Sequence, residues 1–375
     1  NKSAPNKLVS NKSLSNKPTP NAKKDSNSSQ AKQRVVVICP GRGTYNKDEL
    51  GYLKRLHADK VELVELIDEF RREQDQVAIS ELDSMDNYAM KLHTAGENAS
   101  ALIYACAMAD FASINRDNYD IVGVTGNSMG WYIALAAAGA LSPANAIKLI
   151  NTMGSMMVDG VIGGQLIYPI VDENWQIDND LMSLLDDKAC EVNKIEGAEV
   201  YLSIALGGYR VYGGNNKGLK ALEQALPPLD DRYPMNLFNH AAFHTPLLQS
   251  VADKAKDLLS TALFESPTLP LIDGLGNIWQ PHSTDVEQLR QYTLQNQVVE
   301  SYQFSTAVEV AIKEFAPDKI IILGPGATLG GAVAQCLIEH KWRGINNKQA
   351  FIDGQKTDPF VLSMGLKDQR NAVIE

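Results

Sequence analysis

The chain has 375 residues, 44% of them hydrophobic and 21% charged, with a formal net charge of −10 at pH 7. This length is sufficient for one large domain and a smaller one. The four cysteines, at positions 39, 106, 190 and 336, are far apart and form no C-x-x-C pair, which fits free thiols in a reducing, cytoplasmic compartment rather than a disulfide framework. The longest uncharged apolar run, residues 131–141, is too short to cross a bilayer, so no membrane association is expected.

Residues 1–33 differ in composition from the rest of the chain. They are rich in Asn, Lys and Ser, and the pair Asn-Lys recurs at positions 1, 6, 11 and 16. Such a segment cannot bury a core, so we expect a disordered basic linker, as between the domains of a longer protein. A nucleic-acid-binding arm is the alternative, but the segment has no aromatic residue on which a base could stack.

From residue 34 onward, strand and helix patterns alternate, which predicts a parallel sheet covered by helices. Short apolar runs predict strands at Val35–Cys39, Asp120–Val124 and Lys319–Leu323, and helices are predicted at Glu49–Gln74, Asn98–Ala112 and Pro143–Met157. The pattern changes between residues 164 and 234. There "QLIYPIV", "EVYLSIAL" and "YRVYGG" predict short strands and "NKGLKALEQAL" predicts a helix.

The stretch "GVTGNSMGWYIALAAAG", Gly123 to Gly139, contains a serine in a G-x-S-x-G pattern. Ser128 falls between a predicted strand and a predicted helix, where two glycines permit a sharp turn and free helix N–H groups face a developing oxyanion. This arrangement is typical of a serine nucleophile. A serine that only caps the helix is the alternative that the pattern leaves open.

A serine nucleophile needs a base, and histidine is the usual one near neutral pH. Four of the six histidines lie in polar surroundings and are predicted to be surface residues: His57, His93, His282 and His340. The segment "NLFNHAAFHTPLL" holds the other two, His240 and His244. His244 lies at a loop end before the amphipathic run Leu247–Leu263 and is the candidate base; a buried structural histidine is the alternative.

Five segments in order resemble the acyltransferase family of fatty-acid and polyketide synthesis, which includes malonyl-CoA:acyl-carrier-protein transacylase. "VVVICPGRGTY" resembles the opening strand with its P-G-Q-G turn, "TGNSMGW" the serine elbow, and "AAFHTPLL" the A-F-H-[ST] base motif. "QNQVVESYQF" resembles the Q-x-x-x-P-V-x-W segment, and "IIILGPGATLGG" the late G-P-G. The matches span about residues 35–335, most of the chain after the linker.

The resemblance implies a role for each matching residue. Ser128 would be acylated, and His244 would be its base, oriented by the main-chain carbonyl of Gln297 rather than by an aspartate. The backbone N–H groups of Arg42 and Met129 would form the oxyanion hole. The implied fold is a large α/β-hydrolase-like domain with a parallel sheet, residues 34–163 and 235–375, and a small ferredoxin-like subdomain, residues 164–234, with the active site in the cleft between them.

Several residues depart from the family pattern where substrate would bind. Met153 stands where malonyl-loading members carry an arginine that pairs with the malonyl carboxylate, which favours an uncharged acyl group. Phe243 matches the form associated with unbranched malonyl substrates. Asn127 replaces the histidine of the elbow, Trp131 replaces the acidic or amide residue that follows it, and Arg42 replaces the glutamine of P-G-Q-G. An alternative is that the Arg42 guanidinium binds the carboxylate instead.

The resemblance therefore predicts an acyl-CoA:acyl-carrier-protein transacylase that works by ping-pong transfer through an acyl-Ser128 ester. Its substrates would be acyl-CoA and a phosphopantetheine-bearing carrier protein, within fatty-acid or polyketide synthesis. Two alternatives stay open, an editing hydrolase of the same fold and an inactive scaffold that docks a carrier. "GRGTYN" and "GPGATLGG" lack the remaining residues of nucleotide-binding motifs, and no residues have metal-ligand spacing, so no bound cofactor or metal is expected.

Overall fold

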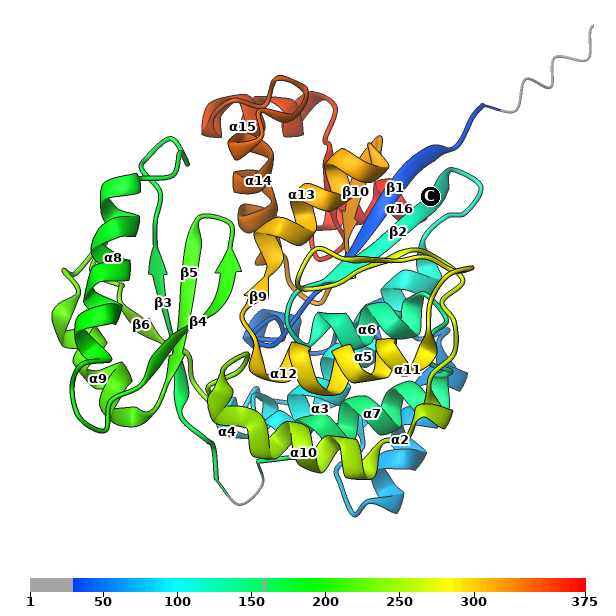
Figure 1. Cartoon of the computed structure of the whole chain (residues 1–375). Helices are drawn as coiled ribbons and strands as arrows, with labels where there is room; N and C mark the ends of the chain where they lie inside the picture. Colours follow the sequence, from blue (N-terminus) through cyan, green and yellow to red (C-terminus); the bar gives the residue numbers. More distant parts are fainter. Residues whose placement is uncertain (1–29, 158–159) are drawn as a thin grey trace, which may run out of the picture. The chain divides into compact units, whose positions relative to one another are not determined.

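The computed structural model describes residues 30–157 and 160–375 (Figure 1). The predicted linker, residues 1–33, therefore lies almost entirely outside the described residues. None of the helices in the two described ranges is long and apolar enough to cross a membrane.

A six-stranded, mainly parallel sheet lies at the centre of residues 32–375. Its strand order is β11-β10-β1-β2-β7-β8, and only β8 runs antiparallel to its neighbour. The strands are β1 (Gln33–Cys39), β2 (Tyr119–Gly126), β7 (Leu271–Ile272), β8 (Ile278–Trp279), β10 (Lys319–Ile322) and β11 (Val361–Ser363). The predicted strands thus lie side by side, β1 between β10 and β2, and the expected parallel sheet is present.

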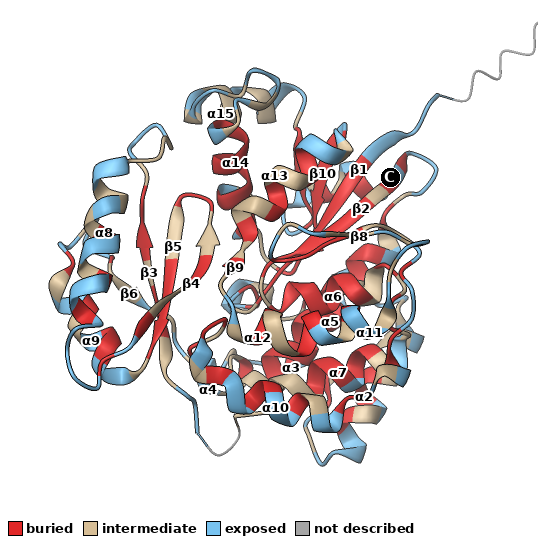
Figure 2. Cartoon of the chain, viewed as in Figure 1, coloured by how far each residue is buried: buried red, intermediate tan, exposed pale blue. Residues whose placement is uncertain are grey.

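Helices cover both faces of this sheet, as the alternation of side chains along β1 requires. Val36 packs against Ala307 and Ala311 of α13 (Phe304–Phe315), whereas Val35 and Val37 belong to the main core on the opposite face. The opposite face carries α5 (Gly96–Ser113), α6 (Gly130–Ala137) and α7 (Pro143–Gly154) (Figures 1 and 2). Five consecutive residues of β1 are consequently buried, Val35 to Cys39.

The other helices of the large unit surround these layers. They are α1 (Tyr52–Leu56), α2 (Val61–Glu73), α3 (Ile79–Ser84), α4 (Met90–His93), α10 (Gln249–Leu258), α11 (Val286–Gln291), α12 (Gln297–Val299), α14 (Leu329–Glu339), α15 (Lys348–Thr357) and α16 (Lys367–Ile374). A π-helical turn, Tyr292–Asn296, connects α11 to α12.

A second sheet has the strand order β6-β3-β5-β4-β9. Its elements are β3 (Gly164–Pro169), α8 (Asn179–Val192), β4 (Val200–Leu206), β5 (Tyr209–Gly214), α9 (Asn216–Ala225), β6 (Met235–Asn236) and β9 (Tyr302–Gln303). The first six follow the β-α-β-β-α-β order of a ferredoxin-like unit. They enclose their own core, which includes Leu166, Leu185, Tyr212 and Leu222. Strand β9 comes from the large unit and pairs in parallel with β4.

One prediction about helices was wrong, and one helix was missed. The predicted helix Glu49–Gln74 is broken into α1 and α2, because the backbone leaves the helical region at His57, whose ring is buried. Gly51, with a left-handed φ of 85°, precedes α1 and delays the start of that helix to Tyr52. Helix α8 was not predicted. Its signals were present in the sequence: Asp178 caps the helix by accepting from two backbone N–H groups, and apolar residues follow at helical spacing.

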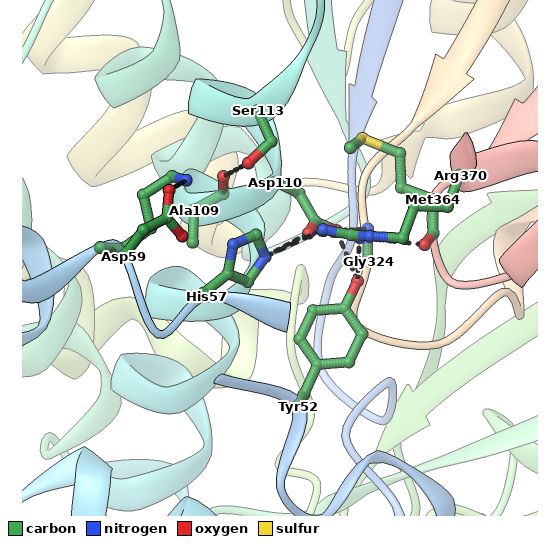
Figure 3. Close-up of polar contacts among 10 residues, drawn as sticks. Tyr52, His57, Asp59, Ala109, Asp110, Ser113, Gly324, Met364 and Arg370 are labelled. Atoms are coloured by element: carbon green, nitrogen blue, oxygen red, sulfur yellow. Dashed lines mark hydrogen bonds and ion pairs between the residues drawn. The ribbon is translucent and has the colours of Figure 1, made fainter. Parts of the chain in front are cut away.

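Asp110 of α5 lies at the centre of a buried polar cluster (Figure 3). Its Oδ1 lies 2.7 Å from both His57 Nε2 and Arg370 Nη1. Its Oδ2 accepts from the Tyr52 hydroxyl at 2.6 Å and from the backbone N–H of Gly324 at 2.8 Å. One carboxylate therefore links α1, α5, α16 and the loop after β10.

The prediction that His57 and His93 are surface residues was wrong. His57 is buried against Asp110, and His93 is buried with Nε2 2.8 Å from the carbonyl oxygen of Leu82. The polar residues beside these histidines in the sequence suggested exposure. Several of those neighbours are indeed exposed, but the two histidines themselves are buried. His282 is exposed, as expected, and His340 is half-buried.

Candidate active site

Ser128 lies on a tight turn between β2 and α6. Its φ of 56° is left-handed, a conformation that costs free energy for a residue with a Cβ and is concentrated at functional sites. The turn requires both flanking glycines. A Cβ on Gly126 would lie 2.3 Å from the carbonyl oxygen of Gly130, and one on Gly130 would lie 2.3 Å from the carbonyl oxygen of Cys39. The G-x-S-x-G pattern is thus the local sequence that this turn demands.

His244 lies against Ser128, with its Nε2 2.6 Å from Ser128 Oγ. Its other ring nitrogen, Nδ1, is 2.6 Å from the carbonyl oxygen of Gln297. A carbonyl can only accept, so Nδ1 carries the proton and the lone pair of Nε2 faces the serine hydroxyl. In this tautomer the imidazole is ready to remove the proton of Ser128.

Gln297 is fixed in place by three contacts. Because α12 ends after Val299, the Gln297 carbonyl is one of the free acceptors at a helix C-terminus, where partial negative charge favours a protonated imidazole. The Gln297 side chain donates from Nε2 to the Ser128 carbonyl at 3.0 Å and accepts from the Tyr132 hydroxyl at 2.8 Å. The same residue therefore contacts both the serine turn and the histidine.

Burial lowers the pKa of His244 to about 4, although the hydrogen bond to the Gln297 carbonyl acts in the opposite direction. The physical cause is that a charged imidazolium loses its hydration inside the protein. The neutral form, which is the form able to act as a base, is therefore the resting state at neutral pH.

The candidate donors of an oxyanion hole are the backbone N–H groups of Arg42 and Met129. Both residues line the cavity that contains Ser128 and His244. Within the described ranges, neither N–H donates a hydrogen bond to a protein acceptor. Met129 directly precedes α6, so its N–H also has the positive end of a helix behind it. The two groups therefore remain the candidate donors to an oxyanion on an acyl carbon bound to Ser128.

Ser128 lies between two cavities. The smaller, about 110 Å³, contains Met153 and Phe243 as well as Ser128 and His244. The larger, about 650 Å³, extends between the two sheets and also reaches Ser128, with Asn127 and Phe243 in its wall.

The position of Trp131 corrects the prediction that this residue binds substrate. Its side chain is fully buried, bonded to Thr293 Oγ1 at 3.1 Å, and lines neither cavity, so a direct contact with substrate is not supported.

The Arg42 side chain borders both cavities. Its Nη2 donates to the carbonyl oxygens of Thr94, at 2.8 Å, and Asn239, at 3.1 Å. The guanidinium carbon lies 5.7 Å from the centre of the Phe243 ring. Burial lowers the pKa of Arg42 to about 10, which leaves the group charged at neutral pH.

Some residues at the site were not identified from the sequence. Tyr132 follows Ser128 by one helical turn, and this spacing was a usable signal for its contact with Gln297. Gln165 and Ser203 reach the His244 loop from β3 and β4, and no local pattern reports such contacts between distant segments. In the part of the chain that the structure describes, no group of three His, Cys, Asp or Glu side chains is placed to bind a metal.

No protein-family model matches the chain. Among curated proteins, it is 23% identical over 303 residues to the malonyl CoA-acyl carrier protein transacylase of Bacillus subtilis, a match that covers 80% of this chain and 89% of that protein. It is also 25% identical over 215 residues to the non-reducing polyketide synthase nscA of Arthroderma otae. The second match covers 56% of this chain and only 11% of the synthase.

Solved structures give the same result for the fold. The malonyl-CoA:acyl carrier protein transacylase of Xanthomonas oryzae pv. oryzae superposes with a TM-score of 0.69 at 18% identity, over 92% of this chain and 98% of that one. A malonyl-transacylase solved with a type II polyketide acyl carrier protein also gives a TM-score of 0.69 at 18% identity, over 91% and 99%. The family resemblance and the fold class predicted from the sequence are thereby confirmed.

Proposed function

The chain is a relative of the malonyl-CoA:acyl carrier protein transacylases, a family of acyltransferases, and we propose that it transfers an acyl group between thioesters through an ester on Ser128. One observation carries the proposal: Ser128 Oγ lies 2.6 Å from the unprotonated nitrogen of an oriented His244, at the meeting point of two cavities. This contact also argues against an inactive scaffold.

In the first half-reaction, His244 Nε2 takes the proton of Ser128 as Oγ attacks the thioester carbon. The N–H groups of Arg42 and Met129 stabilise the resulting oxyanion. Its collapse breaks the carbon–sulfur bond, and the thiolate leaves with the proton from His244. In the second half-reaction, the carrier's thiol gives its proton to His244, its sulfur attacks the ester carbon, and Ser128 leaves reprotonated.

In our proposal, the units that contain the two sheets have different roles. Residues 34–163 and 235–375 would form the catalytic unit, and residues 164–234 the smaller unit that borders the thioester cleft. Acyl-CoA would be the donor and an acyl carrier protein the acceptor, by analogy with the relatives whose names include these substrates. The reaction needs no bound cofactor, and we place it in a reducing, cytoplasmic setting, in which free cysteines are stable.

The test is the intact mass of the protein after exposure to malonyl-CoA. We expect one added acyl group on the wild type and none on Ser128→Ala. Adding an acyl carrier protein should then remove the group far faster than buffer does, whereas an editing hydrolase would lose it equally fast in buffer alone. Mass addition that persists in Ser128→Ala would place the nucleophile elsewhere.

The acyl pocket holds a cation although Met153 replaces the family arginine. Arg42 Nη1 lies on the side of Gly96, since a Cβ built there would be 3.5 Å from Nη1 and 2.7 Å from the carbonyl oxygen of Gly154, the residue after Met153. Within the described ranges, Arg42 Nε and Nη1 donate to no protein acceptor. We therefore favour Arg42 as the partner of a malonyl carboxylate, in place of the uncharged acyl group that Met153 alone suggested.

Replacing Arg42 by glutamine should lower kcat/KM for malonyl-CoA by about 10- to 100-fold, the usual effect of losing a hydrogen bond to a charged group. The backbone N–H at position 42 remains, so acetyl-CoA should lose much less. Met153→Arg is the matched comparison and should change malonyl loading less than Arg42→Gln does. If Arg42→Gln leaves malonyl loading intact and Met153→Arg raises it, the pocket is apolar and our assignment is wrong.

A further inference from the structure

A chain of three polar side chains connects the small sheet to the loop that carries His244. His240 Nδ1 lies 2.8 Å from Gln165 Oε1 on β3. Gln165 Nε2 donates to Ser203 Oγ on β4 at 2.9 Å, and Ser203 donates to the carbonyl oxygen of Phe243 at 2.5 Å. Gln165 and Ser203 are buried, and none of the three side chains has a role in the acyl-transfer steps.

The hydrogen bond that Ser203 donates at one end of this chain determines the tautomer of His240 at the other end. A backbone carbonyl only accepts, so Ser203 must donate to Phe243 and must accept from Gln165. Gln165 therefore turns its NH₂ toward Ser203 and its oxygen toward His240. The oxygen only accepts, so His240 Nδ1 carries the ring proton, and the lone pair is on Nε2.

The Nε2 atom of His240 is available to a ligand in the larger cavity. His240 lines that cavity together with Ser128, and no protein group in the described ranges hydrogen-bonds to Nε2. Gly43, with a φ of 86°, lies alongside, and a Cβ there would come within 3.9 Å of Nε2. A side chain at this position would therefore be in van der Waals contact with the edge of the ring that carries Nε2.

The charge state of His240 limits what it can bind. Burial, and then the neighbouring Arg42 cation, lower the pKa of His240 to about 3, so the ring is neutral at physiological pH. A lone pair repels an anion, and Arg42 disfavours a cationic ligand nearby. The remaining partner is a neutral N–H or O–H donor.

We infer that His240 Nε2 accepts a hydrogen bond from a secondary amide of the thioester arm. The inference rests on the proposed function, in which acyl-CoA and the carrier present the same pantetheine arm to Ser128. That arm is neutral and carries two amide N–H groups, which need acceptors once they leave water. His240 is thus a positioning residue that recognises the arm common to both half-reactions.

The decisive experiment changes the ligand as well as the protein. Malonyl-pantetheine is compared with two isosteres in which one or the other amide N–H is replaced by oxygen. In the wild type, one isostere should acylate Ser128 with kcat/KM lowered about 3- to 10-fold, the effect of one neutral hydrogen bond. In His240→Phe, kcat/KM for malonyl-pantetheine, the amide donor, should fall by the same factor. Neither isostere should then have a kcat/KM below that of the amide donor.

A matched control is His282→Phe, because His282 is exposed on the loop before α11. It should retain the wild-type difference between amide and isostere. Gln165→Leu removes the contact that fixes the tautomer and should reduce the difference without abolishing it. A histidine that only supports the loop would slow all three donors equally, and that result would overturn the inference.

A binding measurement tests this inference independently of the proposed function. Pantetheine itself, titrated against Ser128→Ala protein, requires no acyl transfer. We expect its Kd to rise about 3- to 10-fold when His240→Phe is added and to stay unchanged with His282→Phe. An unchanged Kd with His240→Phe contradicts the amide contact, whether or not Ser128 is acylated. Absence of acylation together with a raised Kd leaves the contact supported and rejects the acyl-transfer mechanism.

Discussion

Replacing His244 by alanine should slow acylation of Ser128 by about two to four orders of magnitude, which is the usual effect of removing a general base. The physical reason is that a serine hydroxyl attacks a thioester poorly until its proton has an acceptor, and the acceptor that we propose is His244 Nε2, 2.6 Å from Ser128 Oγ. Rapid-quench mass spectrometry with acyl-CoA in excess measures the first-order rate of ester formation. His282→Ala, at an exposed histidine, is the control and should react as the wild type does.

The pH dependence checks the same assignment. Because burial lowers the pKa of His244 to about 4, the base is already unprotonated at pH 6, where an ordinary histidine is largely charged. The acylation rate should therefore be nearly constant from pH 8 to about pH 5 and should fall as the pH passes through about 4. A rate that halves near pH 6.5, or a near-normal rate in His244→Ala, would mean that another group is the base.

Replacing Asp110 by asparagine should lower the free energy of unfolding by about 3–5 kcal/mol, the range found when one partner of a buried ion pair is removed. The carboxylate has no exposed surface and lies 2.7 Å from the nearly buried Arg370 guanidinium. Without it, Arg370 stays charged in the interior with no counter-ion. Asparagine keeps only one acceptor oxygen, so either the Tyr52 and Gly324 donors or the Arg370 guanidinium would face an NH₂ group in place of an acceptor. Urea unfolding followed by circular dichroism measures the change.

Asp59→Asn is the matched control for this substitution. Asp59 also pairs with a cation, with Lys60 Nζ 2.7 Å from its carboxylate, but the carboxylate is mostly exposed. An exposed pair contributes little, because water solvates both charges, so unfolding should be unchanged. Equal losses for Asp110→Asn and Asp59→Asn would show that burial of the first pair does not determine its contribution.

Much of the large unit could be predicted from the sequence because its signals are local. The apolar runs of β1, β2 and β10 identify strands buried on both faces, and Ser128 is flanked by glycines whose absence of Cβ the turn requires. His244 was the candidate base from its own sequence surroundings, and the family resemblance strengthened that prediction; the role of Gln297 came from the resemblance alone. Their catalytic roles remain predictions, supported by the contacts described above.

The remainder depended on contacts between distant segments. His57 is buried because Asp110 and Arg370, far away in the sequence, form a site for it. The position of the Arg42 guanidinium depends on carbonyl groups of Thr94 and Asn239, which no motif contains. The hydrogen-bond chain from His240 likewise requires that β3 and β4 lie beside the base loop. Composition and spacing do not report such contacts, since each side chain finds its partner only after folding.

The group that orients the base belongs to the main chain, and this determines what mutagenesis can reveal. Any amino acid at position 297 retains a carbonyl, so an alanine scan would detect only the amide contacts of Gln297 with Ser128 and Tyr132. The orienting group is therefore invisible to ordinary substitution. A backbone ester between residues 297 and 298, made by semisynthesis, would weaken the carbonyl as an acceptor without changing a side chain. It would measure the contribution of the Gln297 carbonyl separately from that of the Gln297 side chain.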